Sequence, residues 1–314
     1  MNCYLGFDGG GTKTECIVLD AEDRVLGQGK AGPSNPLRVG YDAACAALQM
    51  AAAMALSAAR VGTRDIQCVC AGLAGAGRKF VAEEMRSRLA RIWSNAHVEV
   101  VTDADAALET AVGQQAGVIL IAGTGSIALG RNLKGEIARA GGYGHRIGDV
   151  GSAYDIGRHA VLAVARARDF SGPATVLADL ILGPLDCRRW DDVFEKVSSK
   201  PGATFPKLVP AVMQAAAAND AAAREILSRA SVELAGLALT VIGRLDMRGA
   251  SFRLARVGGV FGHSSLLDGR VGDLIQRVAP GAALDMLEQP PALGAARIAL
   301  RNSQKLGAQH GRFS

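Results

Sequence analysis

The sequence predicts a two-domain α/β protein in which one arrangement of strands and helices occurs twice. Near the start, a short apolar strand runs into the glycine-rich turn Gly9–Thr14 and then into another strand. The same order recurs further along, at the turn Gly123–Ser126. Hairpin-linked strands followed by strand–helix–strand crossovers imply a mixed sheet covered by helices. A chain of 314 residues is long enough for two such domains.

The first domain is expected over residues 1–112, as three hairpin-linked strands followed by two helix crossovers. Apolar patterning marks the strands, and the helices are one Ala-rich and one charged segment. The strands are expected near Cys3–Phe7, Glu15–Leu19, Val25–Gly29, Asp65–Ala71 and Val98–Thr102, and the helices at Tyr41–Arg60 and Arg78–Trp93.

The second domain is expected over residues 113–289 and repeats the hairpin pattern. Its strands are expected at Gly117–Ala122, Ile127–Gly130, Glu136–Ala140 and Leu254–Val257, and its main helices at Val150–Arg168 and Ala221–Arg244. A last helix over 290–301, opened by Pro291, completes the first domain. Residues 302–314 are expected to form a flexible tail. A ligand is expected in the cleft between the domains, facing both turns.

The composition indicates a globular protein, with 49% hydrophobic and 21% charged residues. The net charge is +5, but the basic residues are scattered and aromatics make up 4%, so no nucleic-acid partner is expected. The six cysteines form no zinc spacing, and Cys68 and Cys70 are expected inside a strand core. There is no signal-peptide pattern, and the run 43–59 is too short and Ala-rich for a membrane span. A cytoplasmic protein without a membrane partner is therefore expected.

The turn DGGGTKT, residues 8–14, has the residue types that a phosphate-binding turn needs. Its glycines let backbone N–H groups approach an anion, Thr12 and Thr14 add hydroxyls, and Lys13 adds charge. Asp8 is a candidate ligand for Mg²⁺, directly or through a water, because hard cations prefer oxygen. The turn leads into a strand, so it is neither a P-loop nor a dinucleotide motif. An ordinary hairpin turn stays open as the alternative.

Two further glycine-rich turns follow apolar strands. The turn Gly123-Thr124-Gly125-Ser126 forms, with the first turn, a candidate clamp for a nucleotide polyphosphate. The turn 258–262 is suited to a flat base or ribose lying against bare backbone. Each of these turns taken alone also fits an ordinary hairpin.

Asp103 stands at the end of a strand in the segment TDADAA and is the candidate general base. A carboxylate in that place is suited to accept a hydroxyl proton during phosphoryl transfer. A helix N-cap is the alternative role, and the two roles are compatible. Asp105 is expected to point elsewhere and to favour the helix dipole.

The segment 141–152 carries five glycines in twelve residues, which suggests backbone that approaches a ligand. Within it, Tyr143 is expected to stack on a sugar face, Asp149 to accept hydrogen bonds from hydroxyls, and His145 to be structural. Asn35, before Pro36, offers both donors and an acceptor to a sugar, and a plain turn role is an equal alternative.

These motifs, in this order, resemble the N-acetylglucosamine kinase branch of the BadF-type ATPase family, within the actin-like and sugar-kinase superfamily. The resemblance extends to about Leu300 and rests on FDGGGTKT, SNP, AGLAGAG, TDADAA, IAGTGSIA, GGYGHRIGDVGSAY, VGGVFGHS and PPALGAARIA. It implies two ribonuclease-H-like domains that close on ATP, Mg²⁺ and a small amino sugar. It is also compatible with a homodimer.

The resemblance implies a role for each motif in making an amino sugar 6-phosphate, with N-acetylglucosamine as the expected sugar. Asp103 matches the catalytic base that takes the proton from the sugar 6-hydroxyl, and Asp8 matches the metal site. The implied ATP contacts are Gly10, Gly11, Thr12, Lys13, Thr14, Thr124, Gly125, Gly258 and Gly259, and the implied sugar contacts are Asn35, Asp103, Gly142, Tyr143 and Asp149.

Three departures from the family pattern leave the sugar open. Tyr143 stands in place of Trp, Val150 in place of Glu, and Ala74-Gly75 in place of a Ser-containing pair. Glucosamine and N-acetylmuramic acid therefore stay open as substrates beside N-acetylglucosamine. The Cys-rich zinc motif of the repressor-type sugar kinases is missing, so no structural zinc is expected.

Two functions of other classes also stay open. One is an ATPase that activates a 2-hydroxyacyl-CoA dehydratase, which needs cysteines to hold an iron–sulfur cluster between subunits. The other is a non-catalytic sugar sensor on a kinase fold, against which the presence of Asp103 argues.

Overall fold

The computed structural model describes residues 1–310, with side chains described over 1–306. The described chain separates into two compact units. Unit 1 comprises Met1–Gln114 and the described part of Glu288–Ser314, and unit 2 comprises Gln115–Leu287. The domain boundaries expected from the sequence lie close to these.

Unit 1 is a five-stranded mixed sheet with the strand order β3-β2-β1-β4-β5. The first three strands pair antiparallel, and β4 and β5 are parallel to β1. The strands are β1 (Cys3–Gly9), β2 (Thr14–Leu19), β3 (Val25–Ala31), β4 (Ile66–Leu73) and β5 (His97–Thr102); the helices are α1 (Pro36–Val39), α2 (Tyr41–Ala59), α3 (Lys79–Ile92), α4 (Asp103–Val112) and α12 (Pro291–His310), with a short 3₁₀ turn at Thr63–Asp65.

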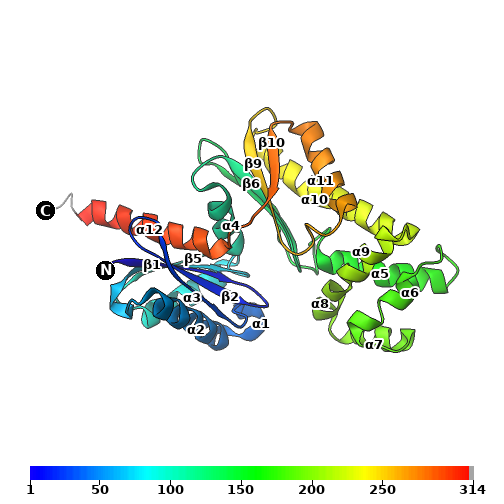
Figure 1. Cartoon of the computed structure of the whole chain (residues 1–314), viewed down its shortest axis with the longest axis horizontal. Helices are drawn as coiled ribbons and strands as arrows, with labels where there is room; N and C mark the ends of the chain where they lie inside the picture. Colours follow the sequence, from blue (N-terminus) through cyan, green and yellow to red (C-terminus); the bar gives the residue numbers. More distant parts are fainter. Residues whose placement is uncertain (311–314) are drawn as a thin grey trace. The chain divides into compact units, whose positions relative to one another are not determined.

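Alternate residues of β1 face two opposite layers of helices. Leu5 and Phe7 pack with α2 and α3, whereas Tyr4 packs with α4 and α12. Figure 1 shows α2 and α3 along one face of this sheet and α12 along the other. Cys68 and Cys70 are buried in the α12 layer, so their predicted core position is confirmed. A period of two with both faces buried is typical of a central strand.

Gly6 allows α12 to approach the centre of this sheet. A Cβ at Gly6 would lie 1.9 Å from the backbone nitrogen of Ala296. We expect Gly6→Ala to lower the free energy of unfolding by about 3 kcal/mol, because two backbones would have to separate. Urea denaturation measures this loss. Gly32→Ala is the matched control, since nothing lies near its added Cβ, and an equal loss in both variants would contradict the close packing.

Unit 2 repeats the topology of unit 1. Its sheet has the order β10-β9-β6-β7-β8, and read from β8 this matches the order of unit 1, with three antiparallel strands followed by two parallel ones. The predicted reuse of one arrangement is therefore confirmed. The strands are β6 (Gly117–Ala122), β7 (Ser126–Arg131), β8 (Ile137–Gly141), β9 (Phe252–Val257) and β10 (Ala282–Met286).

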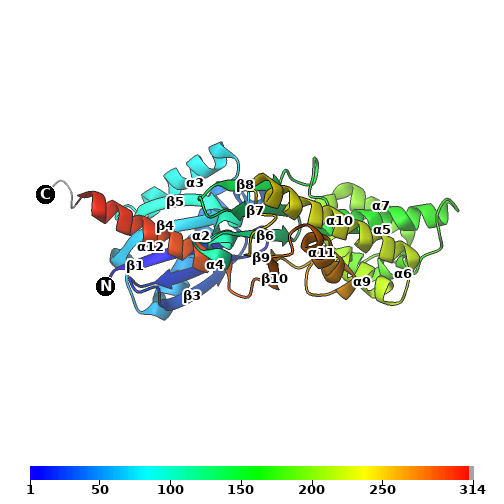
Figure 2. The same cartoon turned by 90° about the horizontal axis from the view of Figure 1, so that it is seen from above.

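Helices make up the rest of unit 2, and α10 lies against β6, β7 and β8. Figure 2 shows α10 and α11 together with the other helices of this unit. The helices are α5 (Ala153–Arg168), α6 (Leu177–Leu180), α7 (Trp190–Ser199), α8 (Pro201–Thr204), α9 (Val209–Ala217), α10 (Ala221–Arg244) and α11 (Ser265–Val278), with 3₁₀ turns at Gly183–Leu185 and Phe205–Leu208.

The sequence patterns did not predict α6 to α9 or β10. The missed helices are short, and α8 and α9 begin with proline near their first turn, so none gives a long amphipathic period. Strand β10 is five residues long and largely unburied, so it lacks an apolar run.

Helix α12 is longer than expected. It continues through His310, so residues 302–310 of the expected flexible tail are helical, and residues 311–314 of that tail lie outside the described residues. The continuation has a physical reason, because Arg301 forms an ion pair of 2.5 Å with the buried Glu109 and Asn302 donates to Glu99. These contacts hold the helix beyond its apolar stretch.

Helices α2 and α10 are long and apolar enough to cross a membrane by length and composition alone. Each buries one face in the core of its own unit. Such burial is the ordinary reason for this composition in a core helix, so the two helices are weak evidence for membrane spans.

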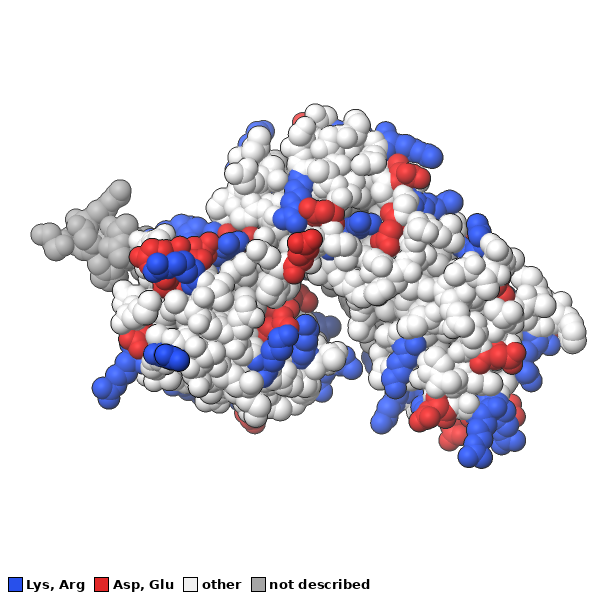
Figure 3. Space-filling view, in the orientation of Figure 1, with Lys and Arg blue, Asp and Glu red and all other residues white. Residues whose placement is uncertain are grey.

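Surface charge is mixed in sign. Figure 3 shows Lys and Arg side chains interspersed with Asp and Glu on the face that it draws. The chain has a net charge of +5, and on this face its basic residues are scattered and do not form one basic patch.

Candidate functional site

The turn between β1 and β2 is closed by backbone hydrogen bonds and tied to the loop that carries Asn35. The Gly10 N–H donates to the Lys13 carbonyl oxygen at 2.9 Å. The Gly10 carbonyl oxygen accepts from the N–H groups of Ser34 and Asn35, each at 3.0 Å. The predicted phosphate turn and the predicted sugar residue Asn35 thus belong to one local structure of unit 1.

The side chains of this turn divide into exposed and buried ones. Thr12 and Lys13 are exposed, and the Lys13 ammonium lies 2.9 Å from Glu15. Thr14 is buried, and its Oγ1 donates to the Gly32 carbonyl at 2.7 Å and lies 2.7 Å from the Ser34 hydroxyl. The Thr14 hydroxyl therefore holds β2 to the loop after β3, and its contact with ATP stays a prediction.

Asp8 and Asp103 are brought to the same face of the unit 1 sheet. Asp8 pairs in register with Gly72 of the neighbouring parallel strand β4, and Asp103 is the first residue of α4, which follows the next strand. Gly72 has no side chain, and a Cβ there would lie 2.7 Å from the Cβ of Ala106 in α4. Gly72 therefore lets the start of α4 lie close to the sheet beside Asp8, a positioning role that the sequence analysis missed.

Both carboxyl groups hold their protons more tightly than ordinary aspartates. Burial raises the pKa of Asp8 to about 7, and the negative charges of Asp103 and Glu15 add to this rise. Burial also raises the pKa of Asp103, against the hydrogen bond that it accepts from the Ala104 N–H at 3.0 Å. Two carboxylates sharing a poorly solvated region form a site in which a cation is electrostatically favoured.

Mg²⁺ fits this donor set. It binds through one or two carboxylates and completes its shell with water and substrate phosphates. Asp8 supplies such a carboxylate, and Asp103 adds negative charge to the same region. Among the described residues there is no group of three or more His, Cys, Asp or Glu side chains arranged to hold a metal ion by themselves.

The N-cap of α4 is Thr102, so the cap role considered for Asp103 is wrong. Thr102 Oγ1 accepts from the Asp105 N–H at 3.0 Å, and the Asp105 carboxylate accepts from Thr102 N–H in return. This reciprocal pair is a capping box. Asp105 thus points back into the cap, and the Asp103 carboxylate lies outside this capping box while it accepts from the Ala104 N–H.

Asn35 caps a helix and also faces the AGLAGAG loop. Its Oδ1 accepts from the Leu37 N–H at 3.0 Å at the start of α1. A Cβ at Gly75 would lie 3.2 Å from this Oδ1, and Gly75 has a positive φ of 94°. The turn role is therefore confirmed for the Asn35 oxygen, and its contact with a sugar stays a prediction.

In unit 2, the predicted phosphate turn and the predicted sugar loop are joined by hydrogen bonds. The Gly142 N–H donates to the Ser126 carbonyl at 2.9 Å, and the Ser126 hydroxyl donates to the Val150 carbonyl at 2.7 Å. The Gly123 carbonyl accepts from the Ala153 N–H at 2.8 Å. The segment 141–152 contains five glycines, and four of them have positive φ: 141, 142, 144 and 151. Because glycine adopts positive φ without strain, this backbone explains why glycines are frequent in the segment.

Asp149 lies against the turn 123–126. Its carboxylate accepts from the Ser126 N–H at 3.4 Å, and a Cβ at Gly125 would lie 2.7 Å from one of its oxygens. Asp149 is buried, has a positive φ of 60°, and burial raises its pKa. Asp149 therefore holds the turn 123–126 in place, a contact that its expected role toward the sugar did not include.

Tyr143 and His145 of this loop have different surroundings. Tyr143 is 61% exposed, and the Arg139 guanidinium lies 5.5 Å from its ring centre. The ring of His145 lies 4.6 Å from that of Tyr154, which packs edge-on against Phe205. Tyr143 thus has a face available for a ligand, and His145 has the structural role that was expected.

The turn after β9 lies against the end of β6. A Cβ at Gly258 would lie 2.4 Å from the Ala122 carbonyl oxygen, and the Gly258 φ is 104°, so glycine is required there. The Asp268 carboxylate of α11 accepts from the Gly262 N–H at 3.0 Å and from the Arg256 guanidinium at 3.1 Å. Asp268 thus connects the end of β9 to the last residue of the turn. No sequence motif had indicated this role for Asp268.

Asp268 gives a test of the turn's role. On the predicted nucleoside contact of the turn 258–262, we expect Asp268→Ala to raise the KM for ATP about tenfold with little change in the KM for the predicted sugar substrate, because the turn loses its anchor. Steady-state kinetics with each substrate varied in turn measures both values. Asp285→Ala is the matched control, since it breaks the exposed pair that Asp285 of β10 forms with Arg253 of β9. An unchanged KM for ATP in Asp268→Ala would contradict the role.

A hollow of about 530 Å³ opens beside these turns within unit 2. Its wall is mostly apolar, and it includes residues of the predicted phosphate turn 123–126 and of the turn 258–262. The lining residues are Gly123, Thr124, Ala153, Pro206, Val209, Pro210, Met213, Gly259 and His263. The predicted ATP residues Thr124 and Gly259 therefore share one cavity.

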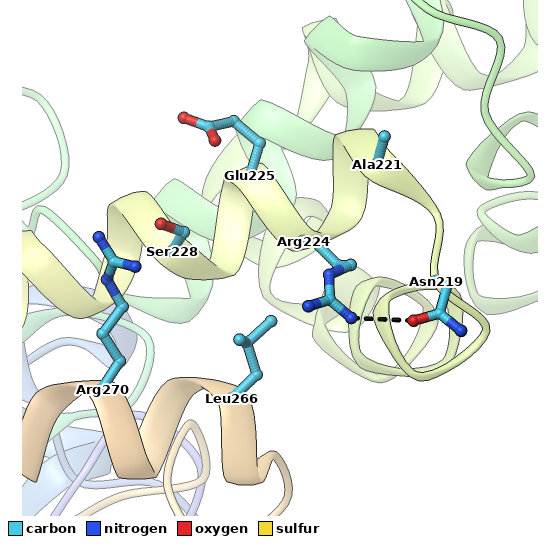
Figure 4. A pocket seen from close by; sticks show the side chains of 7 residues that line it. All are labelled: Asn219, Ala221, Arg224, Glu225, Ser228, Leu266 and Arg270. Atoms are coloured by element: carbon cyan, nitrogen blue, oxygen red, sulfur yellow. Dashed lines mark hydrogen bonds between the residues drawn. The ribbon is translucent and has the colours of Figure 1, made fainter.

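A second hollow of unit 2, of about 450 Å³, lies between α10 and α11. Figure 4 shows it, with the Arg224 guanidinium donating to the Asn219 side chain at 2.9 Å. Its lining contains no residue of the sequence motifs: Asn219, Ala221, Arg224, Glu225, Ser228, Leu266 and Arg270.

The cysteines lie mostly inside unit 1. Cys3, Cys16, Cys45, Cys68 and Cys70 are buried, and Cys187 of unit 2 is half-buried. An iron–sulfur cluster held between subunits needs cysteines at a surface, so these positions do not favour the dehydratase-activator alternative.

Comparison with known proteins agrees with the geometry. The model of the BadF/BadG/BcrA/BcrD ATPase family matches residues 5–299. The chain is 31% identical over 305 residues to the N-acetylmuramic acid/N-acetylglucosamine kinase of Clostridium acetobutylicum, covering 95% of this chain and 98% of that protein. It is 29% identical over 315 residues to the N-acetyl-D-glucosamine kinase of Dictyostelium discoideum, covering 96% and 98%.

Among solved structures, a Chromobacterium violaceum protein described as an N-acetylglucosamine kinase matches with a TM-score of 0.77 at 23% identity. The match covers 95% of this chain and 99% of that one. It supports the fold that was predicted, two ribonuclease-H-like α/β domains, and agrees with the repeated strand order of the two units.

Proposed function

The chain belongs to the BadF/BadG/BcrA/BcrD ATPase family, and we propose that it is a kinase that transfers the γ-phosphoryl group of ATP to the 6-hydroxyl of an amino sugar. Two relatives that match over nearly their whole length are named as kinases of N-acetylated amino sugars. The proposed place of action is the cytoplasm, where ATP is supplied.

The observation that carries this proposal is the pair Asp8 and Asp103 on one face of the unit 1 sheet. Phosphoryl transfer needs a group that accepts the hydroxyl proton and a cation that neutralises the phosphates. Asp103 stands at the start of α4 with its carboxylate outside the capping box. Asp8 lies near enough to Asp103 for the negative charge of Asp103 to raise the pKa of Asp8.

We assign the roles as follows. The Asp103 carboxylate accepts the proton of the sugar 6-hydroxyl as that oxygen attacks the γ-phosphorus. The proposed donors to the phosphates are backbone N–H groups of the turn 11–14 in unit 1 and of Thr124 and Gly125 in unit 2, because the N–H groups of Gly10, Gly123 and Ser126 donate within the protein. Asp8 would hold Mg²⁺, and the bound ion would neutralise phosphate charge. The turn 258–259 lies against the nucleoside.

The favoured sugar is N-acetylglucosamine, with Asn35, Gly142, Tyr143 and Asp149 as its proposed contacts. The exposed ring of Tyr143 supports a stacking contact. N-acetylmuramic acid is the next candidate, because one full-length relative is named for both sugars. A site that pairs with an acetamido group would reject glucosamine by leaving buried polar groups unpaired.

A substrate panel tests the proposal. ADP release, coupled to a colour reaction, is measured with ATP and Mg²⁺ in the presence of N-acetylglucosamine, N-acetylmuramic acid, glucosamine or glucose. We expect sugar-dependent ADP release with N-acetylglucosamine at the highest kcat/KM. Release with none of the sugars would overturn the kinase assignment, and a preference for glucosamine or glucose would overturn the sugar.

A further inference from the structure

The hollow beside the turn 258–262 has an apolar wall that is suited to a flat ring. Of its lining residues, Ala153 and Val209 are buried and Met213 is half-buried. Pro206 and Pro210 complete the wall. A volume of about 530 Å³ lies in the range of small-molecule sites.

This wall offers few side chains that could form hydrogen bonds with the edge of a base. Proline has no backbone N–H, so Pro206 and Pro210 offer no donor. The lining contains no carboxylate, carboxamide or guanidinium side chain, and all of its residues are among those described. Thr124 belongs to the phosphate turn, which leaves His263 as the polar side chain that a base could meet.

His263 does not distinguish one purine from another. A neutral imidazole carries one donor and one acceptor, so it can pair with a 6-amino group or a 6-oxo group. Strong discrimination arises when a wrong ligand leaves buried polar groups unpaired. Contact between a ring and an apolar wall depends on the area of the ring, which adenine, guanine and hypoxanthine share closely.

We propose that this hollow accepts purine nucleoside triphosphates whatever their 6-substituent, so that GTP and ITP replace ATP as phosphoryl donor. This inference rests on the proposed kinase function. Pyrimidine nucleotides are poorer donors, because a single ring covers less of the wall made by Val209, Pro210 and Met213.

Donor kinetics test the inference. Initial rates are measured with ATP, GTP and ITP at saturating sugar and Mg²⁺, and we expect kcat/KM for GTP and ITP within tenfold of ATP. A loss of more than tenfold in kcat/KM for either GTP or ITP would overturn the inference. Met213→Ala is expected to raise the KM for ATP and GTP by an equal factor of about 3 to 10. Met50→Ala, at a residue 60% exposed in unit 1, is the matched control.

A binding measurement separates this inference from the proposed function. ATP and GTP are competed against a fluorescent trinitrophenyl-ATP in the absence of sugar. Equal competition by ATP and GTP would support binding of both purines in the hollow. If the substrate panel then showed no turnover of any sugar, the kinase function would be overturned while the purine inference would stand. Sugar turnover with ATP, together with competition by GTP more than tenfold weaker, overturns the tolerance and leaves the kinase function standing.

Discussion

Asp103→Asn is expected to lower kcat by roughly 10² to 10⁴-fold while ATP still binds. The substitution keeps the size of the side chain and removes the carboxylate that accepts the hydroxyl proton. Because Thr102 and Asp105 make the cap of α4, the helix start should survive the change. We therefore expect the substitution to slow the chemical step and to leave the fold intact.

Single-turnover kinetics and thermal unfolding together check this expectation. Asp105→Asn is the matched control, since it weakens the capping box and leaves Asp103 in place. It should cost about 1 kcal/mol of stability and change kcat only a few-fold. A kcat for Asp103→Asn close to that of the unaltered protein would remove Asp103 from the mechanism.

The pH dependence has a defined sign. Asp103 must be deprotonated to accept a proton, and burial raises its pKa. Activity should therefore fall on the acid side at a pH above the ordinary aspartate range. A kcat/KM profile that stays flat from pH 7 down to about pH 4 would contradict Asp103 as the base.

Asp8→Asn is expected to abolish Mg²⁺-dependent turnover and to stabilise the metal-free protein at pH 8. The pKa of Asp8 rises from 3.8 to about 7 on folding, so the folded state binds this proton more tightly. As pH rises from 4 to 7, this group makes folding progressively less favourable, and above pH 7 its full cost is present. Asparagine removes that cost, which amounts to about 2–4 kcal/mol.

Calorimetric unfolding at pH 8 and at pH 4, without metal, measures this effect. The variant should be more stable than the unaltered protein at pH 8 and about equally stable at pH 4. Addition of Mg²⁺ with ATP should raise the Tm of the unaltered protein more than that of the variant. Equal stability of the two proteins at pH 8 would show that Asp8 is not an unfavourable buried charge.

Regular patterns allowed much of the fold to be predicted from sequence. The strands of both hairpins and the long helices α2, α5 and α10 have apolar runs or long helical patterns, and each was placed close to its observed bounds. Helices α6 to α9 escaped prediction, because short segments with prolines carry no sustained period. Strand β10 was not predicted, because its extended structure depends on its pairing with β9 and its own residues show no strand pattern.

The site was predictable where it depends on residue types that stand out in the sequence, such as clustered glycines or an acidic residue at the end of a strand. The glycine turns and Asp103 are of this kind. The contacts that hold them do not stand out in the sequence, because they join residues far apart in the chain. Asp149 against Gly125, and Asp268 against Gly262, arise from tertiary packing. Gly72 illustrates the same limit, since its meaning comes from Ala106 on a helix that follows the next strand.

Product analysis by ³¹P and ¹H NMR tests the central claim most directly. The protein is incubated with ATP, Mg²⁺ and N-acetylglucosamine, and the phosphate ester is located on the sugar. We expect one phosphomonoester at carbon 6, formed in equal amount to ADP, and formed roughly 10² to 10⁴-fold more slowly with Asp103→Asn. ADP formed without any phosphosugar, or a phosphate at another carbon, would contradict it.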